Sequence, residues 1–277
     1  MNSLDEALSF ARSLAHRAEG EILPRFRNVA VHLKADGSEV TDADREAERV
    51  MREEIVKRYP DHGILGEEWG TVDAHAGRYR WVLDPIDGTA WFALGVPTFG
   101  TLVALLEEGE PVVGVIHFPA LGESMFAARG SGCWYTVGSS EPARVHVRTA
   151  DPLARATVSI SGVHSTNLQP YPSRPAYALS SLVSAAGRMK FVGDCLQHAL
   201  VARGMLHASI DTVMQPWDIA ALVPCIREAG GVVSPLSGTD DGVVFGGSLL
   251  SSCDPTLHAE ILRVLSPAGQ ARSAQLP

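Results

Sequence analysis

The pattern of apolar residues changes near residue 150, and this change limits the folds that the chain can adopt. In residues 99–118, two apolar runs rich in β-branched side chains flank a polar turn around Gly109, which is the pattern of a β-hairpin. Residues 123–137 add further strand-like runs. Helical periodicity precedes them over residues 3–23 and 44–59. The first half therefore predicts paired helices followed by a mostly antiparallel sheet.

Later residues alternate between strand-like and helical runs, which favours an α/β layer. The strands are predicted at 156–162, 189–194 and 205–211, and the helices at 174–187, 195–204 and 217–231. We therefore expect an α+β or α/β protein with an N-terminal part over 1–150 and a C-terminal part over 151–265. The tail from 266 to 277 is rich in Ala, Ser, Gly and Gln, so we expect it to be frayed.

Composition excludes several classes of protein. The 277 residues are 45% hydrophobic and 20% charged, and the formal net charge of −9 argues against a nucleic-acid-binding or anionic-membrane surface. No apolar run approaches the roughly 18 residues that span a bilayer. The four cysteines are widely spaced, which predicts reduced, packed thiols. The N-terminal residues carry acids rather than a signal-peptide core, so we expect a cytoplasmic protein.

Residues 81–92, WVLDPIDGTAWF, carry the most unusual chemistry in the chain. An apolar run delivers Asp84 and Asp87, which are separated only by Pro85 and Ile86. Two carboxylates so close together repel each other unless positive charge lies between them. Because Pro85 restricts the backbone on both sides, we expect the chain to leave the strand in a tight turn. That turn would point both carboxylates and the Ile86 carbonyl to one side.

The residues that follow this turn suggest what the positive charge is. Gly88 and Thr89 are placed to begin a helix whose free N–H groups can bind an anion. Hard cations such as Mg²⁺ prefer carboxylate and carbonyl oxygens. Such a cation would relieve the repulsion and face a phosphate with positive charge. The alternative is an ordinary surface turn, or an aspartate that caps a helix, and this stretch alone leaves both interpretations open.

Two other acidic stretches decide between these interpretations. GEE places Glu67 after an apolar pair and a glycine, and QPWD places Asp218 at the start of an apolar helix. Each acid taken alone could be a solvated side chain or a helix cap. Together with DPIDGT they resemble the motifs of the inositol monophosphatase family of Mg²⁺-dependent phosphatases. VTDADREAE at 40–48 and REAGGVVSPLSG at 227–238 also resemble family segments, so the resemblance covers nearly the whole chain.

The resemblance implies a layered αβαβα sandwich in which the C-terminal part completes a metal site of the N-terminal part. It implies two or three Mg²⁺ ions held by the carboxylates of Glu67, Asp84, Asp87 and Asp218 and by the backbone oxygen of Ile86. Gly88 and Thr89 would hold the phosphate, and Glu67 and Thr89 would orient the attacking water. Asp44 resembles a further acid near the metals, although an exposed helix N-cap is an equal alternative. Lys34 would be either a contact on the phosphate side or, as is usual for loop lysines, a solvated side chain, and we assign it no role.

The implied reaction is metal-assisted hydrolysis of a small-molecule phosphate monoester, and no Ser–His–Asp arrangement is evident in the sequence. Residues 91–124 and 191–204 look most like the histidinol-phosphate phosphatase branch, in which Asp194 would face the substrate and Asp211 would bind its polar body. Either acid could pair with an amine or accept hydrogen bonds from inositol hydroxyls. Inositol 1-phosphate or another sugar or nucleotide phosphate is therefore the alternative substrate. A non-catalytic relative of the fold is a more distant alternative, and a homodimer is usual for such proteins.

Several positions depart from the family pattern and leave the substrate open. Ala90 and Trp91 replace a polar pair after DGT, and Asp211 stands where glutamate is usual, which predicts a deeper pocket. Trp91 would either pack internally or form a stacking wall for a ring-bearing substrate. The histidines from His117 onward show no paired metal-binding spacing, so we expect them to be structural, with His164 as a possible substrate contact.

Overall fold

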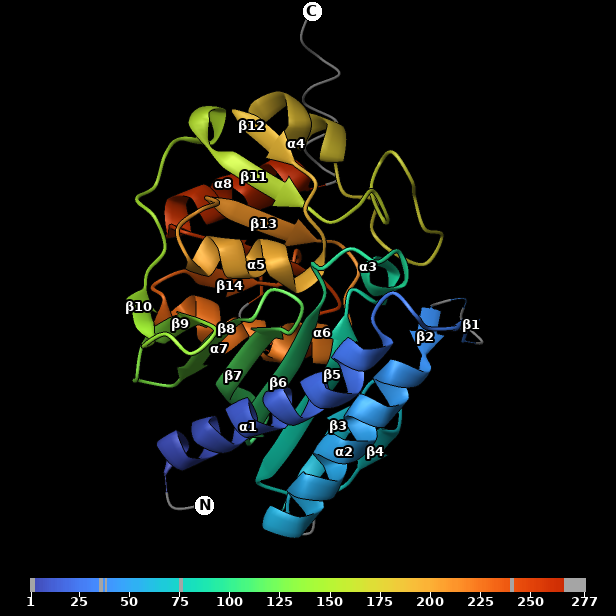
Figure 1. Cartoon of the computed structure of the whole chain (residues 1–277). Helices are drawn as coiled ribbons and strands as arrows, with labels where there is room; N and C mark the ends of the chain where they lie inside the picture. The colour runs from blue at the N-terminus through green and yellow to red at the C-terminus, as the bar shows by residue number, and fades with distance from the viewer. Residues whose placement is uncertain (1–2, 35–36, 38, 75–76, 240–241, 267–277) are drawn as a thin grey trace, which may run out of the picture.

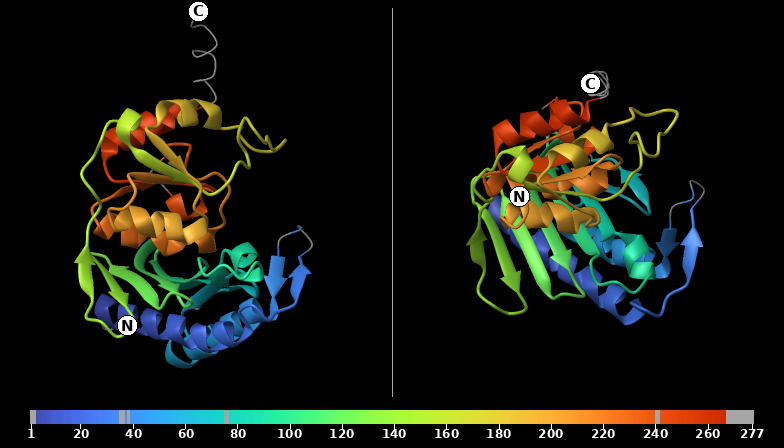
Figure 2. Two further views of the ribbon diagram at one scale, coloured as in Figure 1. Left: turned by 45° about the horizontal axis from the view of Figure 1, so that its top comes forward. Right: turned by 90° about the horizontal axis from the view of Figure 1, so that it is seen from above.

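The chain folds into alternating layers of helix and sheet (Figures 1 and 2). The computed structural model describes residues 3–34, 37, 39–74, 77–239 and 242–266. Two long helices cover the outer face of a large sheet, three shorter ones lie between the large sheet and a small one, and two more cover the far face of the small sheet. In that order the helices are α1 (Leu4–Ile22) and α2 (Asp42–Arg58); α5 (Asp194–Ala202), α6 (Pro216–Ala220) and α7 (Leu222–Glu228); and α4 (Leu179–Ala185) and α8 (Pro255–Leu265). The expected αβαβα sandwich is confirmed.

The large sheet has eight strands in the order β10-β9-β8-β7-β6-β5-β3-β4. All neighbouring strands are antiparallel except β3 and β5, and the predicted hairpin is formed by β6 and β7. The bounds are β3 (Gly63–Gly66), β4 (Gly70–Val72), β5 (Tyr79–Asp87), β6 (Gly100–Glu107), β7 (Glu110–Phe118), β8 (Glu123–Ala128), β9 (Cys133–Val137) and β10 (Ala143–Val145).

The small sheet has five strands in the order β12-β11-β13-β15-β14. The first three are mutually parallel, as strand–helix alternation predicts, whereas β15 runs antiparallel to both of its neighbours. The bounds are β11 (Thr157–Ile160), β12 (Arg188–Lys190), β13 (Ala208–Asp211), β14 (Val232–Ser234) and β15 (Leu249–Ser252). A separate hairpin pairs β1 (Val31–Leu33) with β2 (Glu39–Thr41), and the shorter helical turns are η1 (Leu23–Arg25), α3 (Thr89–Ala93), η2 (Leu153–Arg155) and η3 (Val243–Phe245).

Apolar clusters fill the spaces between the layers. One packs α1 and α2 on the large sheet, a second surrounds the middle helices, and a third packs α4 and α8 on the small sheet. Strand β7 contributes residues to two of these clusters, because Val113 and Val115 face α1 while Ile116 and Phe118 face the middle helices. A strand buried on both faces reads as a continuous apolar run, which is what the sequence shows here.

Two predicted helices are wrong in their limits. The helix expected over 217–231 is divided into α6 and α7 at Ala221, because Pro224 has no N–H and its ring would collide with the carbonyl four residues earlier. The helix expected from residue 174 begins at Leu179. The backbone of Tyr177 is engaged elsewhere, since its N–H donates to Ser165 and its carbonyl accepts from Asn167.

Other expectations concern organisation rather than single elements. The chain passes from the large to the small sheet between β10 and β11, and the division into two parts at residue 150 stays a prediction. The expected frayed tail lies outside the described residues from 267 onward. All four cysteines are buried and unpaired. A membrane-spanning helix is not found among the described residues, where every helix is too short or too polar to traverse a bilayer.

A substitution of Gly114 should test the packing of the middle helices on the sheet. A Cβ at Gly114 would lie 2.3 Å from the carbonyl oxygen of Ala221 and 2.7 Å from Cγ of Pro224, at the junction of α6 and α7. We expect Gly114→Ala to lower the free energy of unfolding by about 1–3 kcal/mol through overpacking. Urea denaturation measures this change.

The matched control is Gly20→Ala, because Gly20 lies within α1 and a Cβ there would meet nothing within 4 Å. We expect this variant to gain up to about 1 kcal/mol from helix propensity. Equal effects of the two substitutions would contradict the packing described for Gly114.

Candidate active site

Three aspartates from distant parts of the chain meet between the large sheet and α6. Asp84 and Asp87 lie at the end of β5, and Asp218 lies in the first turn of α6. One oxygen from each approaches the other two within 4.8 Å. Asp84 is 1% exposed and Asp87 8% exposed, so the cluster is largely removed from water.

The backbone at Pro85 differs from the prediction, because the strand does not end there. Strand β5 continues to Asp87, and its pairing with β6 shifts register between Asp84 and Asp87. This irregularity accommodates a residue that cannot donate to the sheet, and the Thr101 hydroxyl donates to the Pro85 carbonyl at 2.8 Å. The irregularity in the strand, rather than the predicted tight turn, therefore brings Asp84 and Asp87 into one cluster.

Electrostatic repulsion dominates this cluster. Burial, then the charges of Glu67, Asp87 and Asp218, raise the pKa of Asp84 well above its usual value. Burial also raises the pKa of Asp218 to about 8. The Oδ1 atom of Asp84 is buried without a hydrogen-bond partner among the described residues. Buried carboxylate oxygens that lack donors and repel one another have the chemistry of ligands for a hard divalent cation.

Glu67 borders this cluster from the segment after β3 and is paired with a lysine. The Nζ atom of Lys34 lies 2.7 Å from Oε1 of Glu67 and 2.6 Å from Oε1 of Glu68. Burial alone would lower the pKa of Lys34, but the two carboxylates outweigh it and raise that pKa above its usual value. The expectation that Lys34 is merely solvated is therefore wrong. The contact depends on the position of the β1–β2 hairpin relative to the segment after β3, and no local sequence pattern predicts that position.

Glu48 is a further acid that the sequence analysis did not single out. It is fully buried on α2, where its carboxylate accepts hydrogen bonds from the backbone N–H groups of Glu68, at 2.7 Å, and Trp69, at 3.1 Å. Arg52 donates to the same carboxylate at 2.7 Å. A Cβ at residue 66 would overlap Glu48, which accounts for Gly66 in the GEE motif. Glu48 thus positions the segment that carries Glu67.

Asp44 and Asp218 occupy equivalent places on different helices. Each is the third residue of its helix, and each accepts a hydrogen bond from the backbone N–H that precedes the helix, Thr41 at 2.8 Å and Gln215 at 2.7 Å. Oδ2 is engaged in the cap in both residues. Oδ1 of Asp44 accepts from the hydroxyl of Thr89 at 3.2 Å. Asp44 is therefore a buried helix cap and also a neighbour of the site, so the alternative of an exposed cap is wrong.

Helix α3 begins at Thr89, as predicted. Gly88 has a φ of +87°, which is a left-handed conformation that favours glycine, and a Cβ there would lie 2.9 Å from Oδ2 of Asp194. The hydroxyl of Thr89 also lies 3.0 Å from the carbonyl oxygen of Ile86. The structure thus brings Gly88, Thr89 and Ile86 to the edge of the carboxylate cluster.

Asp194 joins the cluster at the N-terminus of α5. The backbone N–H of Cys195 donates to Oδ2 of Asp87 at 2.6 Å, which ties the start of α5 to β5. Burial and then the charge of Asp211 raise the pKa of Asp194 to about 6, while a hydrogen bond from Trp91 lowers it. Trp91 therefore contacts an acid of the site. Whether it also stacks on a substrate ring stays a prediction.

Asp211 is held rigidly by a buried polar network. Its Oδ2 lies 2.6 Å from Nε2 of Gln197 and 2.9 Å from Nε2 of His198. The other ring nitrogen of His198 lies 2.8 Å from the hydroxyl of Ser251. A Ser–His–Asp arrangement that the sequence did not reveal is therefore present. Ser251 and His198 are fully buried, so this arrangement positions Asp211 and is not built to attack a substrate. The ring of His164 lies edge-on to Tyr171, and its predicted contact with substrate remains untested.

Comparison of the sequence and the structure with known proteins identifies one family. Residues 3–270 match the model of the inositol monophosphatase family. A histidinol-phosphatase of Chlorobaculum parvum is 38% identical over 88% of this chain and 91% of its own. An inositol-1-monophosphatase of Mesorhizobium japonicum is 32% identical over 94% of each. The crystal structure of the extragenic suppressor protein suhB from Bartonella henselae superposes with a TM-score of 0.81, at 26% identity over 95% of this chain and 99% of its own.

The family match covers nearly the whole chain, and both relatives named by activity are phosphatases. The order of elements, the acidic cluster and the matched sequences lead to one assignment. The chain belongs to the inositol monophosphatase family and is a phosphoric monoester hydrolase.

Proposed function

We propose that the protein is a Mg²⁺-dependent phosphatase whose substrate is histidinol phosphate. The observation that carries the metal assignment is the convergence of Asp84, Asp87 and Asp218, with an unpartnered buried oxygen on Asp84. Glu67 and the Ile86 carbonyl border the same space and would complete the ligand set. Bound Mg²⁺ would neutralise charge on the phosphate and lower the pKa of water.

Asp44 and Thr89 are suited to direct the attacking water. Burial raises the pKa of Asp44 to about 7, against the opposing hydrogen bonds from Thr41. A carboxylate with that pKa can accept a proton near neutral pH. The Thr89 hydroxyl lies between Asp44 and the Ile86 carbonyl and would hold a water in line with that acceptor. Gly88, which has no side chain, would let a phosphate approach the start of α3.

The choice of histidinol phosphate depends on the acids that border the metal ligands. Asp194 and Asp211 would pair with the amine of histidinol, and a nearby indole at Trp91 offers an aromatic face for a ring. The histidinol-phosphatase relative is 38% identical and the inositol-1-monophosphatase relative 32% identical, and each matches most of the chain. Inositol 1-phosphate is the second candidate, because the same acids accept hydrogen bonds from hydroxyls. A role in histidine biosynthesis, a cytoplasmic location and a homodimer belong to this proposal.

A panel of phosphate esters tests the substrate. We expect phosphate release from histidinol phosphate to have a kcat/KM more than about tenfold above that for inositol 1-phosphate, since a buried acid left without its amine loses at least about 1.4 kcal/mol. Fructose 1,6-bisphosphate and adenosine bisphosphate complete the panel, and each reaction is run with Mg²⁺ and with EDTA. A preference for inositol 1-phosphate would overturn the substrate proposal and leave the phosphatase assignment intact.

Asp87→Asn should abolish turnover without unfolding the protein. The amide can still accept the hydrogen bond from the Cys195 N–H, so we expect cooperative unfolding to persist. Loss of an anionic metal ligand should lower kcat by more than about a hundredfold, since even groups that only orient ligands contribute 10–100-fold. Asp73→Asn is the control, because Asp73 has an 89% exposed side chain. Wild-type turnover in Asp87→Asn would refute the metal site.

Stability should respond to pH in a direction that depends on Mg²⁺. The pKa of Asp218 is raised to about 8, so the metal-free folded state keeps a proton at pH values where the unfolded state has released it. The free energy of unfolding should therefore fall as pH rises from about 4 to 8, by up to about 1.4 kcal/mol per pH unit for each such carboxyl. Millimolar Mg²⁺ should flatten this fall, because ions replace the protons. Urea unfolding at several pH values, with Mg²⁺ or EDTA, measures it; identical slopes would contradict the proposal.

A further inference from the structure

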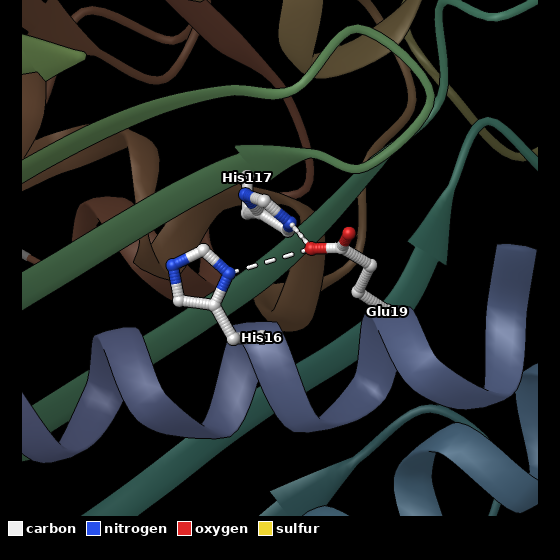
Figure 3. Close-up of side chains that lie close together, drawn as sticks. All are labelled: His16, Glu19 and His117. Atoms are coloured by element: carbon white, nitrogen blue, oxygen red, sulfur yellow. Dashed lines mark hydrogen bonds and ion pairs between the residues drawn. The ribbon is translucent and has the colours of Figure 1, made fainter. Parts of the chain in front are cut away.

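A second group of ligand-type side chains lies apart from the carboxylate cluster. His16 and Glu19 are three residues apart on α1, and His117 lies near the end of β7. Figure 3 shows the three side chains converging between the helix and the strand. One ligand atom of each lies within 4.8 Å of the other two. The sequence around His117 shows no paired metal-binding spacing, because its partners lie on a different element far earlier in the chain.

The large sheet separates this group from the proposed active site. Along β7, Val113, Val115 and His117 project toward α1, whereas Ile116 and Phe118 project toward the middle helices. Asp218 is carried by one of those middle helices, α6. Since side chains alternate between the two faces of a sheet, His117 and the carboxylate cluster lie on opposite faces.

The spacing of the three ligand atoms is close to that of a metal site. Nε2 of His117 lies 2.9 Å from Oε2 of Glu19, and Nδ1 of His16 lies 3.4 Å from the same oxygen. Bonds of about 2.0–2.2 Å to a tetrahedral Zn²⁺ place neighbouring ligand atoms about 3.3 Å apart. Small side-chain movements would therefore suffice. The side chains of His16, Glu19 and His117 are 58%, 32% and 3% exposed, so one side of the group is open to water.

The surroundings of His117 suit a metal ligand. Nδ1 of its ring lies 2.7 Å from the hydroxyl of Ser124, whose oxygen can accept a hydrogen bond from Nδ1–H, and in that tautomer the lone pair of Nε2 is available to a metal. Burial lowers the pKa of His117, although Glu19 opposes this effect, and the neutral ring is the form that binds metals. In the metal-free protein the other neutral tautomer fits both contacts, because Nε2–H donates to Glu19 and Nδ1 accepts from the Ser124 hydroxyl. The carboxylate would turn from an acceptor of N–H bonds into a ligand.

We propose that His16, Glu19 and His117 form a second metal site, which takes a divalent transition metal such as Zn²⁺ with water in the open position. Two imidazoles and one carboxylate favour Zn²⁺ and its neighbours over Mg²⁺, which prefers oxygen ligands alone. A metal there would connect α1 to β7 across the interface between the helical layer and the large sheet. The proposal does not depend on the substrate or on the active-site metal.

Metal titration of the whole protein tests this proposal. The protein is held in millimolar Mg²⁺ to occupy the carboxylate cluster and is titrated with Zn²⁺ by calorimetry, and with Co²⁺, whose visible absorption reports nitrogen ligation and low coordination number. We expect wild type to bind one ion more than His16→Ala, or to bind it more than about tenfold more tightly. Zn²⁺ should raise the Tm of wild type and leave that of His16→Ala unchanged.

Two further variants keep the result interpretable. His146→Ala removes another exposed histidine and should bind Zn²⁺ as wild type does. His117→Gln keeps a donor for Glu19 but loses the imidazole, so it should lose the same ion as His16→Ala while unfolding cooperatively. Equal Zn²⁺ stoichiometry and affinity in wild type, His16→Ala and His117→Gln would overturn the proposal. A wild-type protein that binds no Zn²⁺ beyond the Mg²⁺ site would overturn the proposal and show that these residues form only a hydrogen-bonded cluster.

Discussion

Mutual repulsion among buried carboxylates is the constraint on which the rest of the site depends. Asp84, Asp87 and Asp218 are brought together in a largely buried space, and each is driven toward its protonated form. Such a cluster is stable in a protein interior only if the carboxylates bind cations or are neutralised by protons. The fold therefore has to hold these oxygens together by contacts that act before any cation arrives, and that requirement explains features that would otherwise look unrelated.

For Asp44, Asp87 and Asp218 those contacts are hydrogen bonds that engage one oxygen of each carboxylate. Asp218 uses Oδ2 to cap the N-terminus of α6, as Asp44 uses Oδ2 to cap α2. Asp87 accepts from the first turn of α5 through the Cys195 N–H. Helix N-termini carry partial positive charge, so they stabilise these carboxylates as well as orienting them. Three helices from both halves of the chain thus converge on β5, and the small distortion of β5 at Pro85 lets its two aspartates meet them.

The acids lie in local motifs, whereas the contacts that orient them join distant segments, and this difference explains what could be predicted from the sequence. The helices, the hairpin of β6 and β7 and the αβαβα layers followed from apolar periodicity and from the family resemblance. The acids of GEE, DPIDGT and WD were identified because each motif is local. The contacts of Lys34, Glu48 and His198 were missed, because each joins segments whose proximity is created only by the packing of layers. The position of Pro85 was misjudged for a related reason: a local rule for proline predicted a turn, and pairing with β6 kept the strand intact.

The two faces of the large sheet offer metals different chemistry, and this difference follows from what each face is packed against. On the side of the middle helices, helix N-termini and a bulged strand gather oxygen ligands in a buried space, which suits a hard cation held beside a phosphate. On the other side, α1 contributes one imidazole and one carboxylate and β7 contributes a second imidazole, in a group that is partly open to water, which suits a softer cation. Ligand type would therefore separate the two ions even if both were present, because Mg²⁺ gains little from imidazole. The same β-sheet that isolates the faces also connects them mechanically, so an ion that connects α1 to β7 would stiffen the sheet that carries Asp84 and Asp87 on β5.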